Sequence, residues 1–346
     1  MTVASGCALR AYDEKVLLYA VTLSGAGPAC QRLGTGVSHR GRVHDRRMTT
    51  DRTRQLLDLP DGRALCFAEW GDPDGFQVLA LHGTPGSRLN RHPDEREYAA
   101  VGARWITYDR PGYGGSTRLP GRSVVDGVGD VEALADHLGL ERFAVTGGSG
   151  GGPHSLAVAA RLGPRVVRAR CAVGVVPYDT EGFDWFAGMA EMNVVEFGWA
   201  LEGEETLRPN IAREHADFVR RVAEDPADML GGWEIDEADK AVLARSDMAQ
   251  VIREFGADMA VGGYWGWVDD DLAFTRPWGF DLAEITVPVE VRYGTKDTLV
   301  PAAHGEWLAE HVPGATAVVE DDEGHMGDPD QVGGLVGWLV TGRYPD

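Results

Sequence analysis

The sequence feature that most constrains the fold is a serine set among glycines, Gly-Gly-Ser-Gly-Gly, at positions 147–151. This serine, Ser149, stands in a G-x-S-x-G motif that directly follows an apolar run and precedes an alanine-rich segment of helical character. Such a strand-to-helix turn strains the backbone of its central residue, and side chains on the flanking glycines would collide with the neighbouring strand and helix. The motif therefore predicts a nucleophile elbow, with Ser149 presented at the N-terminus of a helix.

A glycine-rich turn can also bind phosphate groups. In that case a Lys-Ser or Lys-Thr pair would follow the glycines, or a G-x-G-x-x-G register would lead to a downstream ribose-binding acid. Neither pattern is convincing around residues 147–151. The phosphate-binding alternative is therefore disfavoured.

From Arg63 onward, short apolar runs bounded by Gly, Pro and Asp alternate with segments of helical period, which predicts an α/β fold with a mostly parallel sheet covered on both faces. The predicted strands are 63–70, 77–81, 104–108, 143–146, 169–175, 287–293 and 316–319. The turn at 72–75 should join the first two strands as a hairpin. Apolar spacing predicts a helix over 123–140 and a last helix that includes 332–339.

The alternation breaks between Pro177 and Phe280, in a segment rich in aromatic residues, Met and acidic patches. A parallel sheet tolerates such an insertion between a strand and the next helix, so we expect a helical cap over the carboxyl ends of the strands. The predicted organisation is an N-terminal extension, a first part of the core, the cap and a second part of the core, over residues 1–47, 48–177, 178–280 and 281–346.

Size and charge limit the classes of protein to consider. At 346 residues the chain is long enough for one large α/β core with an inserted subdomain. Its 33 Lys+Arg and 54 Asp+Glu give a net charge of -21, which disfavours nucleic acid and anionic lipid as partners. No apolar run reaches the ~18 residues that a membrane-spanning helix needs.

The four cysteines and the N-terminal segment point to a cytoplasmic protein. The cysteines form no C-x-x-C pair and no cluster with histidines, which argues against a disulfide framework and against a zinc site. The apolar run at 16–23 is short and follows Asp13 and Glu14, unlike a secretory signal. We expect residues 1–47 to be disordered, or to be an over-extended gene start that precedes Met48.

A second motif, His-Gly-Thr-Pro-Gly-Ser at 82–87, ends the second predicted strand. A turn at this place can direct a backbone amide at an oxygen beside the serine, so the N–H groups of Thr84 and Gly150 are the predicted oxyanion hole. His82 lies on the same loop, and a structural, hydrogen-bonded role is the favoured interpretation for it over that of general base.

Five segments together resemble the α/β-hydrolase superfamily, over about residues 60–342. They are HGTPGS at 82–87, DRPGYGGS at 109–116, GGSGG at 147–151, YGTKDTLVP at 293–301 and DEGH at 322–325. The resemblance implies a nucleophile, acid and histidine in that chain order. It also implies that Asp109 and Arg110 belong to a structural turn near the pocket rim and have no catalytic role.

The chemistry of a serine nucleophile agrees with this order. Serine needs a histidine within hydrogen-bond reach, itself oriented by a buried carboxylate. Asp297 follows the strand 287–293 and His325 follows the next strand, so both can reach Ser149 at one edge of the sheet. The predicted catalytic residues are Ser149, Asp297 as orienting acid and His325 as general base, with Asp179 as the rival acid.

These residues predict a serine hydrolase that cleaves an ester, amide or related bond of a small, partly apolar substrate through an acyl-enzyme, with carboxylic ester hydrolysis favoured and no cofactor or metal required. Alternatives are carbon–carbon bond hydrolysis, acyl transfer, cofactor-free oxygen chemistry, aminopeptidase activity and a non-catalytic ligand-binding protein. The segment HGTPG is similar to the HGGPG of proline iminopeptidases. However, that family has a bulky residue directly after its serine, where this chain has Gly150. An aspartate at position 149 would indicate an epoxide hydrolase or a dehalogenase. Because this residue is a serine, those two mechanisms are excluded.

Overall fold

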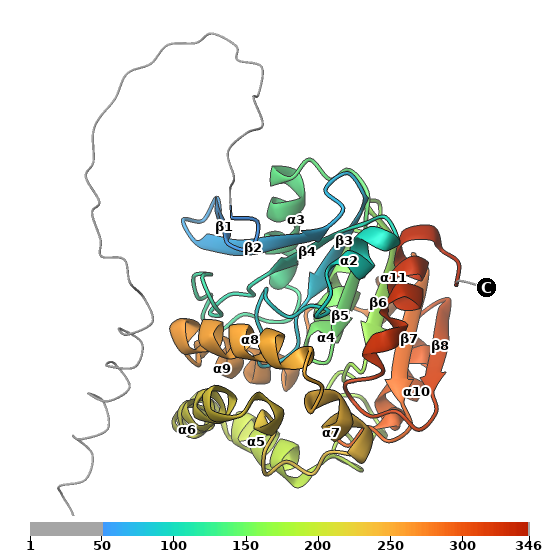
Figure 1. Cartoon of the computed structure of the whole chain (residues 1–346). Coiled ribbons are helices and arrows are strands. Elements are labelled where there is room, and N and C mark those ends of the chain that lie inside the picture. Colours follow the sequence, from blue (N-terminus) through green and yellow to red (C-terminus); the bar gives the residue numbers. More distant parts are fainter. Residues whose placement is uncertain (1–50, 345–346) are drawn as a thin grey trace, which may run out of the picture. The chain divides into compact units, whose positions relative to one another are not determined.

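A computed structural model describes residues 51–344, in which eight strands form one sheet of order β1-β2-β4-β3-β5-β6-β7-β8 (Figure 1). The strands are β1 (Gln55–Asp58), β2 (Ala64–Gly71), β3 (Phe76–Leu81), β4 (Ala103–Tyr108), β5 (Phe143–Gly148), β6 (Val166–Ala172), β7 (Val289–Gly294) and β8 (Ala315–Glu320). The two pairs that involve β2 are antiparallel, and the other neighbouring strands are parallel. The predicted α/β class with a mostly parallel sheet is confirmed.

Helices cover both faces of this sheet, as its alternating side chains require. The helices that flank it are α2 (Arg96–Ala100), α3 (Gly127–His137), α4 (Gly151–Arg161), α10 (Ala302–His311) and α11 (Val332–Thr341). Leu79 and Val145 point into the core under α3, α4 and α10, whereas Val78 and Ala144 point into the core under α2 and α11. Burial on both faces explains why these strands are apolar along their whole length.

The predicted hairpin between the first two long strands is wrong. Gly75 N–H donates to Asp72 O at 3.1 Å, so the chain turns there. However, β2 pairs with β4, in which Phe67 lies opposite Tyr108, and β3 lies between β4 and β5 in parallel pairs. The apolar run of β3 is buried on both faces, and a central position in the sheet satisfies that burial better than a hairpin does.

The largest other differences from prediction concern three elements. Strand β1 is not among the predicted strands, because it is short and alternates between half-buried and exposed residues. Strand β6 begins and ends three residues earlier than predicted, because Ala172 O accepts the N–H of Ser149 and the next residue, Val173, has φ +47°. Helix α3 is shorter than 123–140, since the carboxylate of Asp126 accepts from the N–H and hydroxyl of Ser123 in a turn before it.

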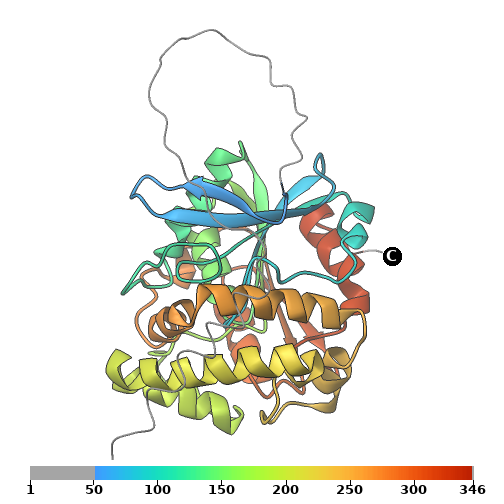
Figure 2. The same cartoon turned by 60° about the vertical axis from the view of Figure 1, so that its left-hand side comes forward.

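Five helices follow β6 and precede β7, within the segment predicted as the cap. They are α5 (Glu191–Glu202), α6 (Glu204–Glu224), α7 (Glu237–Leu243), α8 (Met248–Gly262) and α9 (Trp265–Phe274). Figure 2 shows α5, α6, α8 and α9 grouped on one side of the sheet. They share a core of their own that includes Phe218, Phe255 and Trp267, while Phe197 and Phe274 also pack into the core of the sheet.

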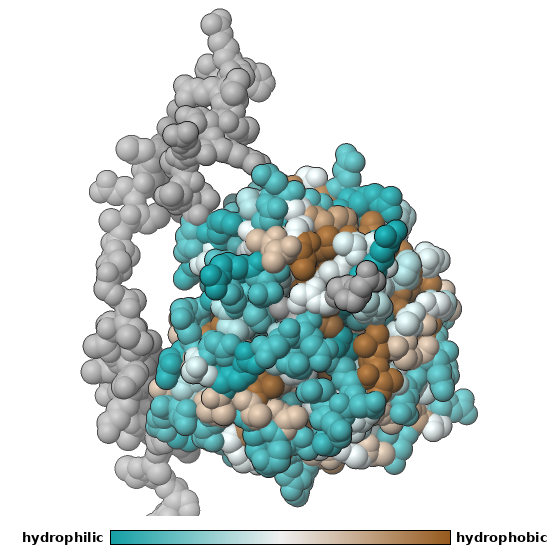
Figure 3. Space-filling view, turned by 45° about the vertical axis from the view of Figure 1, so that its right-hand side comes forward, coloured by the Kyte–Doolittle hydropathy of each residue, from teal (hydrophilic) through white to brown (hydrophobic). Residues whose placement is uncertain are grey.

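One face of the molecule is mainly polar (Figure 3). On the face shown in Figure 3, hydrophilic residues prevail and hydrophobic residues form scattered groups. Within residues 51–344, no helix combines the length and the apolar character that crossing a membrane requires. The predicted extension at 1–47 lies outside the described residues, as do the first two cysteines. Cys66 and Cys171 are free and buried.

Candidate active site

Ser149 lies in the turn between β5 and α4 with a strained backbone. Its φ is +53°, which is uncommon for a residue with a side chain, and its N–H donates to Ala172 O at 2.8 Å. A Cβ on Gly147 would lie 2.0 Å from Gly151 O, and a Cβ on Gly151 would lie 2.2 Å from Leu81 O. The predicted reason for both flanking glycines is therefore confirmed.

Asp297 and His325 form the predicted pair on the loops after β7 and β8. His325 Nδ1 lies 2.7 Å from Asp297 Oδ2, and the Asp297 side chain is fully buried. The other oxygen, Oδ1, accepts the N–H groups of Leu299 and Val300 at 2.8 and 2.9 Å, which holds the carboxylate in place. The rival acid Asp179 is exposed.

Asp239, on helix α7, holds the loop that carries His325 and was not predicted from the sequence. Its two carboxylate oxygens accept the N–H of His325 at 3.0 Å and that of Met326 at 2.7 Å. Burial disfavours the charged imidazole, but the carboxylates of Asp297 and Asp239 outweigh it and raise the pKa of His325 above its ordinary value. This arrangement favours a histidine that accepts a proton readily.

Ser149 and His325 line the same cavity, of about 310 Å³, together with Thr84 and Gly150. Among the hydrogen bonds of residues 51–344, none joins Ser149 Oγ to His325 Nε2. Catalytic contacts are often long before substrate binds. The structure thus brings four of the five predicted residues to one cavity, with the fifth, Asp297, behind His325.

Thr84 is fixed by its side chain. Its hydroxyl donates to Asp270 Oδ2 on α9 at 2.6 Å and accepts from Arg110 Nη2 at 3.0 Å. Arg110 Nη2 also donates to Gly83 O at 2.9 Å, so a fully buried guanidinium holds the loop. Neither the N–H of Thr84 nor that of Gly150 donates to a turn or side-chain acceptor within residues 51–344, and both residues line the cavity.

His82 has a structural role, as the sequence favoured. Its Nδ1–H donates to Gly83 O at 2.7 Å, and its Nε2 accepts the N–H of Arg110 at 3.1 Å. Burial and the charge of Arg110 hold the pKa of His82 well below its ordinary value. Asp109 also has a structural role, because its carboxylate accepts hydrogen bonds from Arg88 Nη1 at 2.7 Å and from the N–H of Gly115 at 2.9 Å.

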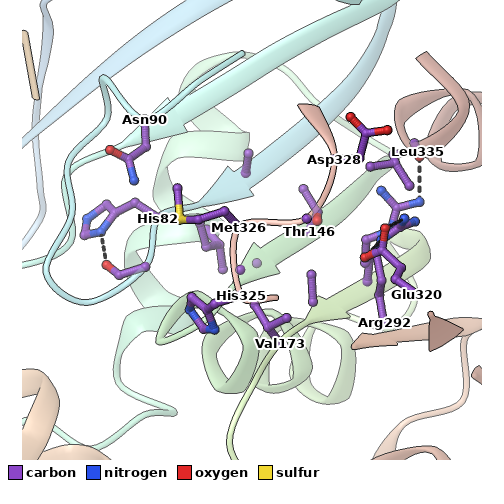
Figure 4. Close-up of a pocket in the computed structure, with 18 of the residues that line it drawn as sticks. His82, Asn90, Thr146, Val173, Arg292, Glu320, His325, Met326, Asp328 and Leu335 are labelled. Carbon is purple, nitrogen blue, oxygen red and sulfur yellow. Dashed lines mark hydrogen bonds and ion pairs between the residues drawn. The ribbon is translucent and has the colours of Figure 1, made fainter. Parts of the chain in front are cut away.

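A second cavity, of about 290 Å³, adjoins the first and shares Asn90, Val173, His325 and Met326 with it. Figure 4 shows His82 and Asn90 on one side of this cavity, Arg292 with Glu320 on the other, and His325 and Val173 between them. Arg292 Nε donates to Glu320 Oε2 at 2.5 Å, so these charges neutralise each other. His325 therefore lies between the two cavities and lines both.

Two carboxyl groups that sequence reasoning missed, Glu196 of α5 and Asp271 of α9, also line the first cavity. Burial raises the pKa of Glu196 to about 7, and burial together with Glu196 raises the pKa of Asp271 well above its ordinary value. Within residues 51–344, no group of three or more His, Cys, Asp and Glu side chains is arranged to hold a metal ion. Three consecutive acids in the apolar segment 265–274 are the one signal that could have drawn attention to Asp271.

Comparisons with known proteins agree with this fold. Residues 77–327 match a family model described as the alpha/beta hydrolase fold. A proline iminopeptidase of Xanthomonas citri is 37% identical over 113 residues, which are 30% of this chain and 34% of that protein, so the match spans about a third of that relative's length. A non-heme chloroperoxidase of Streptomyces lividans is 27% identical over 245 residues, 70% of this chain and 82% of that protein.

Solved structures show the same fold at low sequence identity. A hydrolase from Pseudomonas aeruginosa PA01 superposes with a TM-score of 0.60 at 20% identity, and covers 84% of this chain and 100% of that one. This likeness supports the architecture and says nothing of the substrate.

Proposed function

The chain belongs to the alpha/beta hydrolase fold family, and from this premise we propose that it is a serine hydrolase that acts through an acyl-enzyme on Ser149. The observation that supports the proposal most is that Ser149, at φ +53° between β5 and α4, lines the same cavity as His325, whose Nδ1 lies 2.7 Å from buried Asp297. A strained serine, a histidine and a buried carboxylate are the set that nucleophilic catalysis by serine needs.

Each group has a distinct role in the proposed reaction. His325 Nε2 takes the proton of Ser149 Oγ as that oxygen attacks the substrate carbonyl carbon, and Asp297 stabilises the imidazolium. The N–H groups of Thr84 and Gly150 bind the oxyanion. His325 then protonates the leaving group, and water activated by the same histidine releases the acid and restores Ser149.

The cavity suits a small substrate with apolar surface. Its lining includes Phe197, Phe218, Trp233, Phe255 and Phe274, and its volume is about 310 Å³. The same side chains also pack in the hydrophobic cores, so their aromatic character does not by itself indicate which substrate binds. They do limit its size. Esters and amides of short acids are the substrates that we propose.

Aminopeptidase activity is the second candidate, and the similarity to proline iminopeptidases favours it. One local feature differs from that family. A Cβ on Gly150 would lie 2.2 Å from Thr84 Oγ1, so Thr84 fills the place where a bulky residue after the serine would begin. We therefore base the proposed substrate on the cavity of this chain and not on the names of these relatives.

The test compares wild type with Ser149→Ala, using a fluorophosphonate probe and p-nitrophenyl esters of increasing chain length. We expect covalent labelling and p-nitrophenol release in wild type and in Ser123→Ala, a serine whose hydroxyl is bonded to Asp126, and neither in Ser149→Ala. Turnover that survives in Ser149→Ala, or wild type that is not labelled, would remove the proposed mechanism and favour a non-catalytic binding protein.

A further inference from the structure

Three consecutive acids on α9 are all buried, yet only two of them have an arginine partner. Asp269 accepts from Arg118 at 2.8 Å, and Asp270 accepts from Arg110 and Arg122 at 2.6 Å. Those two arginines keep the pKa of Asp270 well below its ordinary value in spite of complete burial. Asp271 has no hydrogen bond to any cation within residues 51–344, although its exposed fraction is 0%.

The neighbour of Asp271 is a second carboxyl, Glu196 of α5. Glu196 Oε1 accepts the indole N–H of Trp267 at 2.8 Å, which fixes this side chain. Three oxygens, Glu196 Oε2 and both carboxyl oxygens of Asp271, are buried, and within residues 51–344 no group outside this pair donates a hydrogen bond to them. Buried acceptors without a donor cost free energy, because they have lost their hydration.

The surrounding charges do not satisfy the pair. Glu214 of α6 adds to the negative potential at Glu196, and Asp270 adds to that at Asp271. Arg122 is close enough to lower the pKa of Asp271, but its Nη2 is directed to Asp270. Burial and mutual proximity raise the pKa values of both carboxyls, which favours a proton shared between them.

We propose that Glu196 and Asp271 form the subsite for a protonated amine of the substrate, in the cavity that also holds Ser149. This inference rests on the proposed serine hydrolase function. A primary ammonium carries three N–H donors, which equals the number of carboxyl oxygens that receive no hydrogen bond from outside the pair. When the ammonium binds, it replaces the shared proton as the positive group between the carboxylates, and that proton passes to solvent. The substrate class is then an ester or amide whose acyl part carries an amine.

The first test measures binding without catalysis. Solutions of n-butylammonium and 1-butanol, which differ in the charged group, are titrated into Ser149→Ala and followed by ligand NMR. We expect the ammonium to bind about tenfold to a hundredfold more tightly, since hydrogen bonds to charged groups exceed neutral ones in strength. The further double substitution Glu196→Gln with Asp271→Asn should abolish that preference. Glu191→Gln, an exposed acid on the same helix α5, should retain it.

The second test uses substrates in wild type. L-alanine p-nitroanilide and propionic acid p-nitroanilide differ in the α-amino group alone, and we expect the first to have the lower KM. In the double variant the KM for the amine should rise to that of the neutral substrate, whereas in the control Glu191→Gln kcat/KM for both substrates should stay within about twofold of wild type. Circular dichroism checks that the amide replacements, which keep the shape of the side chains, leave the fold intact.

The outcomes separate the two proposals. Equal binding of n-butylammonium and 1-butanol overturns the amine subsite and leaves the carboxyl pair as a structural proton-sharing contact, whatever the enzyme does to esters. Tight ammonium binding without hydrolysis by wild type supports the subsite and removes the serine hydrolase function. A preference that survives in the double variant also overturns the subsite.

Discussion

At the scale of single residues, Thr84 and Gly150 depend on each other although 66 positions separate them in the numbering. The Thr84 hydroxyl cannot yield to a larger neighbour, because Asp270 and Arg110 hold it at 2.6 and 3.0 Å. A Cβ on residue 150 would approach that hydroxyl to 2.2 Å and Phe274 to 3.0 Å. The position after the nucleophile must therefore be glycine for the loop to keep its shape.

We predict that Gly150→Ala lowers kcat/KM for p-nitrophenyl acetate by about a hundredfold, since the collision displaces the Thr84 loop and a shift of about 1 Å in a catalytic group has that effect. Gly148→Ala is the matched control one residue before the serine, where an added Cβ meets no atom within 4 Å. Its activity should stay close to wild type. Equal losses in the two variants would contradict a specific role of the space beside Thr84.

The pH dependence of activity should report on His325. A general base must be neutral, and the carboxylates of Asp297 and Asp239 raise its pKa, so kcat/KM should be full above that raised pKa and fall as the pH drops through it. Asp239→Asn removes one stabilising charge and one carboxylate acceptor. We expect the acid limb of the pH profile to move to lower pH and the plateau to fall roughly tenfold, because the loop is held less firmly.

Glu237→Gln is the control for this measurement, because Glu237 lies on the same helix α7 but is exposed and pairs with Lys240. Its profile should coincide with wild type. If Asp239→Asn lowers the plateau without moving the acid limb, Asp239 has a structural role alone, and the influence on His325 that we infer is absent.

The sequence predicts Ser149, Asp297 and His325 as a set because each stands in a short segment whose residues and order are typical of the proposed chemistry. Asp239, Glu196 and Asp271 act through contacts between helices that are far apart in the chain, and such contacts leave no local pattern. Asp239 in particular binds backbone N–H groups, which any residue at 325 and 326 would offer. The roles of these three acids follow from the packing of α5, α7 and α9.

At the scale of elements, the packing of α9 against the loops after β3 and β4 depends on one buried charge cluster. Asp270 of α9 accepts from Thr84, Arg110, Tyr113 and Arg122, and Nε2 of His154 on α4 lies 3.6 Å from its Oδ1. We predict that Asp270→Asn lowers the free energy of unfolding by about 3–5 kcal/mol, because two buried guanidinium groups lose their counter-charge. Urea denaturation followed by circular dichroism measures the change.

Asp269→Asn is the comparison on the same helix. Its partner Arg118 is 24% exposed, so water can replace the lost carboxylate, and a loss of about 1 kcal/mol is expected. Similar losses in the two variants would contradict the inference that burial of the Asp270 cluster fixes α9.

Local patterns located most strands and helices within a few residues but did not give their order in the sheet. The turn at 72–75 is real, and a turn between two apolar runs usually predicts a hairpin. The partner of β2 is β4 because β3 needs a neighbouring strand on both sides. Which strands pair depends on all the strands of the sheet, so a short stretch of sequence cannot show it. The early end of β6 depends likewise on the Ser149 turn, which takes the carbonyl of Ala172.

At the scale of the whole molecule, the net charge of -21 creates a field that attracts cations and repels anions. If the substrate carries an ammonium, that field raises its concentration near the cavity, and added salt screens the effect. The screening length falls from about 30 Å at 0.01 M ionic strength to about 3 Å at 1 M. We therefore predict that the KM of L-alanine p-nitroanilide rises several-fold over this range, whereas that of propionic acid p-nitroanilide changes little.

The double variant Glu196→Gln with Asp271→Asn distinguishes the long-range field from the local subsite. It removes two of the 54 acidic residues, so the field outside the cavity is nearly unchanged, but the short-range contact with the ammonium is lost. The salt dependence of KM for the amine should persist in this variant at a higher KM throughout. A salt dependence that disappears with the two carboxyls would assign the attraction to the subsite alone, and one that is equal for the neutral substrate would show that salt acts on the protein and not on the charge of the substrate.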